Sequence, residues 1–290
     1  MKICLIGKNL TNFVLAKNLA NKNLIVDILF DSDRENKLSQ RTLAISKENF
    51  DYLYSINNHM KIPAWPVKNI KIYSDKNTSK ELLEFKAKNK ENFFLVKYVD
   101  IFNSFEQFCK INKKIKLKKI NYKLKSNKTI LEKNYKLIIN SDKNNNFNYK
   151  KVEKNYNAIA YTGILSHEIK KKNNEAIQIF TKYGPIAFLP LSKTKTSIVF
   201  SISNNYKINE KQLFDLIKKY NLNYKIKKIS KFEKANIKFL MPRNYLHKNT
   251  LFFGDILHTI HPLAGQGFNM TIRDIKMLSS LIDEKIELGL

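Results

Sequence analysis

The stretch from Gly254 to Asp274 combines residue types and spacings that could hold a planar, electron-accepting cofactor. An apolar run leads into Gly254 and Asp255, so a buried strand would deliver a carboxylate at its C-terminal edge. After a proline-containing loop, Gly265 and Gly267 open a segment whose apolar residues recur at helical spacing. Backbone N–H groups and the helix dipole at such a start would stabilise negative charge on a bound ring.

Glycine is scarce in this chain, so its positions are informative. Seven of the 290 residues are glycine, which is about a third of the usual ~7%. Three of the seven, Gly254, Gly265 and Gly267, fall within fourteen residues. We therefore expect the backbone there to need a positive φ or a close approach to a ligand.

The N-terminal residues predict a β-α-β unit of the kind that binds a phosphate. Short apolar runs at residues 2–7 and 24–30 flank a segment with helical spacing of apolar side chains. In such a unit the first strand ends at the helix N-terminus, where N–H groups and the helix dipole favour a phosphate. The Gly-x-Gly-x-x-Gly pattern maps onto Gly7, Asn9 and Asn12, so only its first glycine is present. Asparagine is the non-glycine residue most tolerant of a left-handed backbone.

The middle of the chain is rich in expected strands. We place strands at residues 70–73, 82–85, 93–99, 114–124, 129–131, 136–140, 158–165, 176–180, 186–191, 197–202, 237–241 and 251–253. Further helices are expected through Phe102, Phe105 and Phe108, over residues 210–220, and through Ile275, Leu278 and Ile282. Pro63 and Pro66 mark a break, and the polar residues 142–155 are the best linker candidate.

The net charge of +28 raises nucleic acid as a partner, but the composition argues against it. Only four of the 53 basic residues are arginine, and the lysines at residues 113–119 and 225–231 are interleaved with apolar residues. Such lysines are typical of the solvated faces of half-buried strands. We predict no nucleic-acid partner, and of the two binding alternatives attraction to an anionic membrane surface is favoured over nucleic acid.

The two cysteines and the lack of long apolar runs indicate where in the cell the protein is expected. Cys4 and Cys109 stand in apolar or helical contexts without metal-type spacing, which predicts buried, reduced thiols. The N-terminal apolar run is too short for a secretory signal, and no later run reaches the roughly 18 apolar residues of a membrane span. We expect a cytoplasmic protein, with peripheral contact at the inner face of a membrane as an open alternative.

Three segments resemble one known family. The residues from Gly254 onward are similar to the signature of FAD-dependent aromatic-ring monooxygenases, and the form His-Pro-x-Ala-Gly-Gln-Gly-x-Asn at 261–269 most resembles the ubiquinone-biosynthesis hydroxylases. Residues 184–191 are similar to that family's substrate-domain strand, and residues 41–46 to its arginine segment after the second strand. The three matches are collinear, and the resemblance spans residues 1–274.

This resemblance implies an α/β fold in two parts. One part is an FAD/NAD(P)-binding, glutathione-reductase-like domain of Rossmann type, and the other is an inserted β-sheet substrate domain. We expect the first domain to comprise residues 1–60, 92–147 and 246–290, and the second to comprise residues 61–91 and 148–245.

The resemblance also implies roles for individual residues. Asp255 would hydrogen-bond the ribityl chain of FAD, and Arg41 would lie near the pyrophosphate, where a planar guanidinium makes bidentate contacts. The isoalloxazine ring would be lined by Pro262, Gly265, Gln266, Gly267, Phe268 and Asn269. The remaining cofactor-binding positions would be Gly7, Asn9, Asn12, Asp31, Asp142 and Gly254. Phe188, Leu189 and Pro190 would line the substrate, and no catalytic residue is identified.

The implied chemistry is hydroxylation of the ring of a polyprenylated phenolic precursor in ubiquinone biosynthesis. NAD(P)H would reduce FAD, and reaction with O2 would give a flavin hydroperoxide that transfers one oxygen to the substrate. The departures from the family pattern keep a second reading open. Besides Asn9 and Asn12, Phe30 stands where an acidic residue is expected, Lys143 follows Asp142 where the family has glycine, and the chain ends about sixteen residues past the signature. The alternative is a non-catalytic relative that serves as an assembly or lipid-binding partner in the same quinone-biosynthesis complex.

Other polar residues receive simpler interpretations. Asp255, His258 and His261 could be read as metal ligands, but the proline and glycines around them suit a flavin loop better, so we predict no metal. His59, His167 and His247 lack a partner pattern and are predicted to be surface or capping residues. Trp65 is predicted to be a packed turn aromatic rather than a pocket residue.

Overall fold

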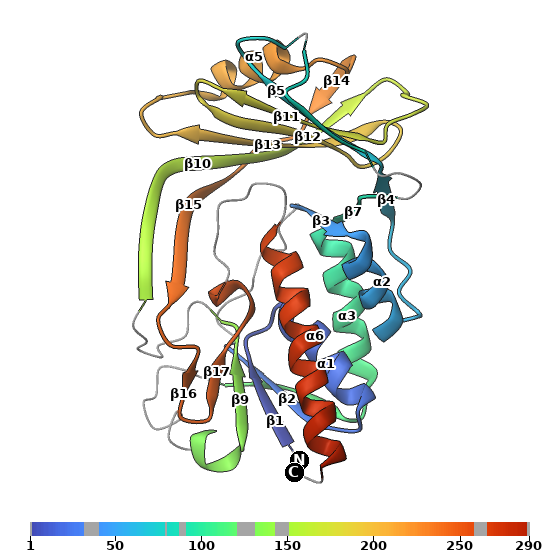
Figure 1. Ribbon diagram of the computed structural model, residues 1–290, viewed down its shortest axis with the longest axis vertical. Coiled ribbons are helices and arrows are strands. Elements are labelled where there is room, and N and C mark those ends of the chain that lie inside the picture. Colours follow the sequence, from blue (N-terminus) through green and yellow to red (C-terminus); the bar gives the residue numbers. More distant parts are fainter. Residues whose placement is uncertain are drawn as a thin grey trace.

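Two sheets of different character organise the chain, one above the other in Figure 1. The computed structural model describes residues 2–31, 41–78, 80–86, 91–120, 131–142, 151–257 and 266–288. A mostly parallel sheet with helices on one face forms the lower layer, and a mostly antiparallel sheet forms the upper one. A small three-stranded sheet lies between them.

The lower sheet has six strands among the described residues, in the order β16-β17-β9-β1-β2-β8. Their bounds are β1 (Lys2–Ile6), β2 (Ile25–Phe30), β8 (Ile115–Lys119), β9 (Leu137–Asn140), β16 (Leu246–His247) and β17 (Thr250–Phe252). All neighbours in this sheet pair in parallel except β16 and β17. The carboxyl ends of the parallel strands therefore share one edge of the sheet, where ligands of such folds bind.

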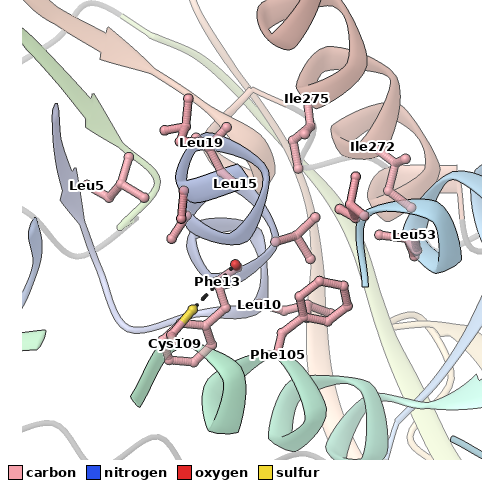
Figure 2. Close-up of a cluster of buried hydrophobic side chains, with 14 of the residues drawn as sticks. Leu5, Leu10, Phe13, Leu15, Leu19, Leu53, Phe105, Cys109, Ile272 and Ile275 are labelled. Atoms are coloured by element: carbon pink, nitrogen blue, oxygen red, sulfur yellow. Dashed lines mark hydrogen bonds between the residues drawn. The ribbon is translucent and has the colours of Figure 1, made fainter. Parts of the chain in front are cut away.

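Helices α1 (Leu10–Asn21), α3 (Tyr98–Ile111) and α6 (Gln266–Glu287) cover one face of this sheet. Helix α1 is buried on nearly all sides because it lies between α3 and α6, as Figure 2 shows with Cys109 of α3 on one side of α1 and Ile275 of α6 on the other. Burying each such side chain contributes about 1.5–3 kcal/mol. This packing fixes the N-terminus of α1 against the carboxyl ends of the strands.

Both cysteines are free and buried, which confirms their prediction as reduced core thiols. Burial raises the pKa of Cys4 and of Cys109 to about 12, so both stay protonated at neutral pH. The Cys109 thiol donates a hydrogen bond to the carbonyl oxygen of Phe13 over 3.6 Å, which links α3 to α1 (Figure 2).

The upper sheet contains, within the described chain, eight strands in the order β14-β10-β13-β12-β11-β5-β6, with β15 also paired to β10. Their bounds are β5 (Asn69–Ser74), β6 (Leu83–Lys86), β10 (Lys151–His167), β11 (Glu175–Thr181), β12 (Gly184–Pro190), β13 (Lys195–Ser203), β14 (Ile226–Ile229) and β15 (Glu233–Pro242). Helix α5 (Glu210–Tyr220) packs on the face that points away from the lower layer. Its start is fixed by a capping box between Asn209 and Gln212.

Strands β3 (Thr42–Ser46), β7 (Phe93–Lys97) and β4 (Ala64–Val67) form the small antiparallel sheet, and α2 (Lys47–Ile56) follows β3 directly. A 3₁₀ turn, η1 (Gly254–Ile256), connects β17 to the residues before α6. These short elements lie where the two layers meet (Figure 1).

Most expected elements are confirmed within about two residues. The β-α-β start, the hairpin of β5 and β6, and the bounds of α5 agree with the sequence prediction. The agreement is best where apolar periodicity is local and unbroken, because that pattern alone determines which face of an element is buried.

Several expectations are wrong. The proposed linker at residues 142–155 overlaps β10, whose exposed residues 151–155 are held by pairing with β15. Leu131 lies in a helical turn and does not belong to a strand, and Pro66 lies inside β4. His167 is 3% exposed, and its ring nitrogen lies 3.1 Å from the Thr196 hydroxyl, because it points from β10 into the core under α5.

Candidate functional site

The loop after β1 requires a glycine at its first position. Gly7 has a φ of +112°, and its N–H donates to the carbonyl of Leu29 over 2.8 Å. A Cβ atom on Gly7 would lie 2.9 Å from Nδ2 of Asn9 and 3.0 Å from Cβ of Asp142. The loop is therefore closed tightly over the carboxyl ends of β1 and β9, and no side chain fits there.

Asn9 and Asn12, at the two other glycine positions of the motif, close the loop with their side chains. Oδ1 of Asn9 accepts from the N–H of Asn12 over 3.0 Å, which makes Asn9 the N-cap of α1. Nδ2 of Asn12 donates to the carbonyls of Ile6 (2.9 Å) and Gly7 (2.7 Å). The left-handed backbone that we expected asparagine to tolerate is absent, because Asn9 has a φ of −145° and Asn12 lies within α1.

Residues at the end of β9 complete this side of the loop. The hydroxyl of Ser141 accepts from Nδ2 of Asn9 over 2.9 Å, and the N–H of Ser141 donates to the Ile6 carbonyl over 3.2 Å. Oδ1 of Asn140 accepts from the N–H of Asp142 over 3.0 Å. Asp142 is thus held beside Gly7, whereas Asn140 and Ser141 were not among the predicted site residues.

The connection from β17 packs directly on the first turn of α1. Gly254 has a φ of +66°, and a Cβ there would lie 2.7 Å from Cγ2 of Thr11. The N–H of Phe253 donates to the Asn140 carbonyl over 2.9 Å, which fixes the end of β17 against β9. Asp255 follows in η1 and is partly buried. The predicted carboxylate is therefore delivered to the N-terminal end of α1.

Tyr98, the first residue of α3, joins this group although no sequence pattern indicated it. Its N–H donates to the Arg41 carbonyl over 2.9 Å, and the Arg41 guanidinium lies 4.3 Å from the centre of its ring. The Arg41 guanidinium hydrogen-bonds its phenolic oxygen, and the backbone N–H of Leu10 lies near enough to that oxygen to lower the pKa of Tyr98. Burial raises the pKa of Tyr98 and the charge of Asp255 raises it further, while Arg41 and the Leu10 N–H oppose the rise. The sequence pattern placed Tyr98 inside a strand at residues 93–99, whereas it lies just past the end of β7.

Asn269 ties the start of α6 to β3 and α2. Its Oδ1 accepts from the N–H of Ser46 and from Nδ2 of Asn49, each over 2.9 Å, and its Nδ2 donates to the Ala44 carbonyl over 2.7 Å. Phe268 beside it is buried in the core. The side chain of Asn269 therefore positions α6 relative to the strand that follows Arg41.

The predicted cofactor positions fall into three groups. Six lie around the N-terminus of α1 and the adjoining strand ends, namely Gly7, Asn9, Asn12, Asp142, Gly254 and Asp255, and Arg41 joins them through Tyr98. Asp31 directly follows β2, whose end pairs with the Gly7 loop at the same sheet edge. Gly267, Phe268 and Asn269 lie in the first turn of α6 with Gln266, while Pro262, Gly265, His258 and His261 lie outside the described residues.

The predicted substrate-lining residues do not share one face of the upper sheet. Phe188 is 1% exposed and packs under α5, with its ring centre 6.2 Å from that of Tyr224. Pro190 is buried two residues on, and therefore on the same side of β12. Leu189 points to the opposite face and packs against Val67 and Leu95. Phe188 and Pro190 therefore lie on the α5 side of β12 and Leu189 lies on the opposite side, because side chains alternate along a strand.

The described residues hold neither a metal-type cluster nor a helix that could span a membrane. They contain no group of three or more His, Cys, Asp or Glu side chains that could hold a metal ion. None of their helices is long and apolar enough to cross a membrane.

Comparison with known proteins relates the chain to flavin monooxygenases of quinone biosynthesis. No family model matches it. Mitochondrial ubiquinone biosynthesis monooxygenase COQ6 of Danio rerio is 26% identical over 173 residues, covering 46% of this chain and 36% of that protein. The COQ6 proteins of Xenopus tropicalis and Homo sapiens are each 28% identical over 50% of this chain, covering 41% and 40% of their own lengths. The resemblance to ubiquinone-biosynthesis monooxygenases is thus confirmed. The chain spans about 40% of the length of these relatives.

Solved structures of FAD-dependent monooxygenases share the fold. PqsL, a probable FAD-dependent monooxygenase of Pseudomonas aeruginosa, superposes with a TM-score of 0.76 at 13% identity, covering 100% of this chain and 88% of PqsL. The p-nitrophenol 4-monooxygenase PnpA of Pseudomonas putida gives a TM-score of 0.75 at 9% identity, covering 99% of this chain and 80% of PnpA. The expected α/β fold with a Rossmann-type FAD-binding domain is consistent with this likeness.

Proposed function

We propose that this chain is an FAD-dependent monooxygenase that hydroxylates the ring of a polyprenylated phenolic precursor in ubiquinone biosynthesis, with NAD(P)H and O2 as co-substrates. The observation that carries the proposal is the convergence of the Gly7 loop, Asp255 and Arg41 on the N-terminus of α1. Sequence likeness to COQ6 proteins supports the pathway, and likeness in fold to FAD-dependent monooxygenases supports the cofactor.

The described residues fit a flavin dinucleotide. Gly7 and Gly254 let the loop after β1 and the end of β17 pack closely around the N-terminus of α1, since a Cβ at either position would collide with its neighbours. The α1 N-terminus and the Arg41 guanidinium suit a pyrophosphate, and the Asp255 carboxylate suits hydroxyl groups of a ribityl chain. A site with these two chemistries along one sheet edge matches the pyrophosphate and the polyol of FAD in turn.

Each residue would have a distinct task in this site. Arg41 would pair with the pyrophosphate, Asp255 would accept hydrogen bonds from the ribityl chain, and the backbone at Gly267–Asn269 would lie along the ring. Bound FAD would supply the reductive activation of O2, for which protein side chains have no equivalent. The chain's contribution would be to orient the ring and to exclude water.

We further propose a division into two domains that matches these tasks. The lower layer, with residues 1–60, 92–147 and 246–290, would be the glutathione-reductase-like FAD domain. Residues 61–91 and 148–245 would form the substrate domain. The half-buried face of the upper sheet opposite α5 carries Leu189, Ala187, Val199 and Ile164, an apolar surface suited to a prenylated ring.

Retention of flavin tests the proposal. The protein would be incubated with FAD, desalted and examined by absorbance, beside Asp255→Ala and the matched control Asp215→Ala, whose carboxylate lies exposed on α5. We expect flavin bands in the wild type and the control, weaker bands in Asp255→Ala, and NAD(P)H oxidation that follows the flavin content. A folded, colourless wild type would contradict the proposal.

One observation favours the alternative of a non-catalytic assembly or lipid-binding partner. Donors at the α1 N-terminus are already engaged by this chain's own side chains, Asn9 and Tyr98. This alternative predicts a folded protein that captures other enzymes of the quinone pathway while neither retaining flavin nor oxidising NAD(P)H.

Contact with a membrane surface is the remaining part of the proposal. The net charge of +28 favours attraction to anionic lipids, near which a prenylated substrate would reside. Cosedimentation with phosphatidylserine-containing vesicles, but not with neutral vesicles, would support peripheral binding. Equal behaviour with both would argue against it.

A further inference from the structure

Two side chains of this chain engage hydrogen-bond donors at the α1 N-terminus that a pyrophosphate would use. The first N–H groups of a helix have no partner within the helix and commonly bind an anion. Here Oδ1 of Asn9 accepts from the N–H of Asn12 over 3.0 Å. The phenolic oxygen of Tyr98 faces the N–H of Leu10, and this interaction lowers the pKa of Tyr98. The seat for an anion is thus engaged from within the chain.

The Asn9 carboxamide is also held from a second side. Its Nδ2 donates to the Ser141 hydroxyl over 2.9 Å and approaches the Ser141 carbonyl at 3.3 Å. The same Nδ2 lies 2.9 Å from the point where a Cβ of Gly7 would be. The side chain therefore fills the space that the glycine leaves open, at a motif position where glycine normally leaves room for the phosphate.

Tyr98 restrains the second phosphate-binding group as well. Its ring stacks against the Arg41 guanidinium at 4.3 Å, and its hydroxyl hydrogen-bonds the same guanidinium. Arg41 is the residue to which the proposed function assigns the pyrophosphate. One tyrosine thus engages both a helix N–H and the arginine.

We propose that Asn9 and Tyr98 form a closed gate over the pyrophosphate seat, which a dinucleotide must open by displacing the Asn9 carboxamide from Asn12 and Ser141. The gate lowers the affinity of this chain for dinucleotides relative to a chain with glycine at position 9. This inference rests on the proposed function, because it concerns how the same site admits FAD.

The gate makes a quantitative prediction for FAD binding. Removing the Asn9 carboxamide releases one N-cap hydrogen bond before binding, which corresponds to about a tenfold gain in affinity. Asn9→Gly removes the carboxamide but also makes the backbone more flexible. Asn9→Ala removes the carboxamide without that added flexibility, since the φ of −145° at Asn9 suits alanine. Tyr98→Phe keeps the ring but removes the hydroxyl that faces the Leu10 N–H. We expect it to tighten FAD binding by less than the Asn9 variants do.

The experiment measures the Kd for FAD by flavin fluorescence and calorimetry for the wild type, Asn9→Gly, Asn9→Ala and Tyr98→Phe. Asn209→Gly is the matched control, because Asn209 caps α5 through the same bond, Oδ1 to the Gln212 N–H at 2.9 Å. Melting temperatures without FAD show that each variant is folded. We expect tighter binding in the three site variants and an unchanged Kd in the control.

The possible results separate the gate from the proposed function. A wild type that binds FAD, beside Asn9→Gly and Asn9→Ala variants that bind it about tenfold more tightly, supports the gate and the proposed function together. A wild type that binds FAD, with Asn9→Gly and Asn9→Ala equal or weaker, overturns the gate and leaves the proposed function standing. Folded proteins of which none binds FAD overturn both.

Discussion

The hydroxyl of Tyr135 lies 2.6 Å from Oδ2 of Asp27, in the middle of the parallel sheet. Lys118 and Lys2 approach the same oxygen at 2.7 Å and 2.9 Å from the two strands that flank β2. The Asp27 carboxylate has no exposed surface, and its Oδ1 has no hydrogen-bond partner among the described residues. The buried Asp27 carboxylate therefore links β2 to both neighbouring strands, and its charge is stabilised by the three donors Tyr135, Lys118 and Lys2.

This arrangement predicts loss of stability in acid. Burial alone would raise the pKa of Asp27, but the hydrogen bonds from Lys118, Tyr135 and Lys2 outweigh it and hold the pKa below its ordinary value. A depressed pKa contributes stability that is complete above the unfolded value of about 3.9 and is lost as the pH falls through the folded value. Asp27→Asn should therefore lower the free energy of unfolding by about 1–3 kcal/mol at pH 7 and flatten its decline below pH 4.

Urea unfolding between pH 2.5 and 7 measures this difference, with the exposed Asp215→Asn as the control. Curves for Asp27→Asn and the wild type that stay parallel through the acid limb would show that Asp27 does not carry the effect.

The hydrogen bonds that Asn269 makes to β3 and α2 predict a loss of stability when they are removed. Asn269→Ala removes the bonds to Ser46, Asn49 and Ala44, which should cost about 2–4 kcal/mol at about 1 kcal/mol each. Asn269→Asp keeps both acceptor roles, but it sets a carboxylate oxygen against the Ala44 carbonyl oxygen in place of the donor, so at pH 7 it should cost as much as Asn269→Ala or more. Denaturant unfolding gives the totals, and amide hydrogen exchange at Ser46 reports the local loss. A cost for Asn269→Asp well below that for Asn269→Ala would mean that the bond to Ala44 does not set the stability.

Local patterns were sufficient for the parts of the fold that they control. The β-α-β start and α5 follow from apolar spacing and caps that lie within a few residues. The positive φ expected at Gly254 is confirmed, at +66°, and the close neighbour of this glycine is the Thr11 side chain. The β-α-β start and α5 are decided by residues that are neighbours in the sequence.

Features that depend on distant partners could not be predicted. Asn9 acts as a cap held by Ser141, which lies 132 residues away. Tyr98 lies at a strand-to-helix boundary, where the apolar pattern is ambiguous. The sides on which Phe188 and His167 lie are set by strand pairing, because a shift of one residue exchanges the two faces of a strand.

The opposite faces of β12 predict opposite effects for neighbouring residues. Phe188→Ala should cost about 3–5 kcal/mol of unfolding free energy, because it leaves a cavity under α5. Leu189→Ala should cost less, because Leu189 is only partly buried, but it should weaken binding of a prenylated phenol to the FAD-loaded protein. Unfolding curves and substrate titrations separate the two effects. A larger affinity loss for Phe188→Ala than for Leu189→Ala would contradict the assigned faces.

The contact between Gly254 and Thr11 predicts a stability loss that a second substitution partly repairs. Gly254→Ala places a Cβ 2.7 Å from Cγ2 of Thr11 and holds alanine at a φ of +66°, which alone costs about 1–2 kcal/mol. Thr11→Ala removes the colliding methyl group, so the double variant should be more stable than the sum of the single effects indicates. It should not reach the wild type, because the backbone strain persists. Because Asp255 follows Gly254, the single variant should also lose bound FAD and the double variant should recover part of it. Strictly additive effects on stability would show that β17 does not seat Asp255 through this contact.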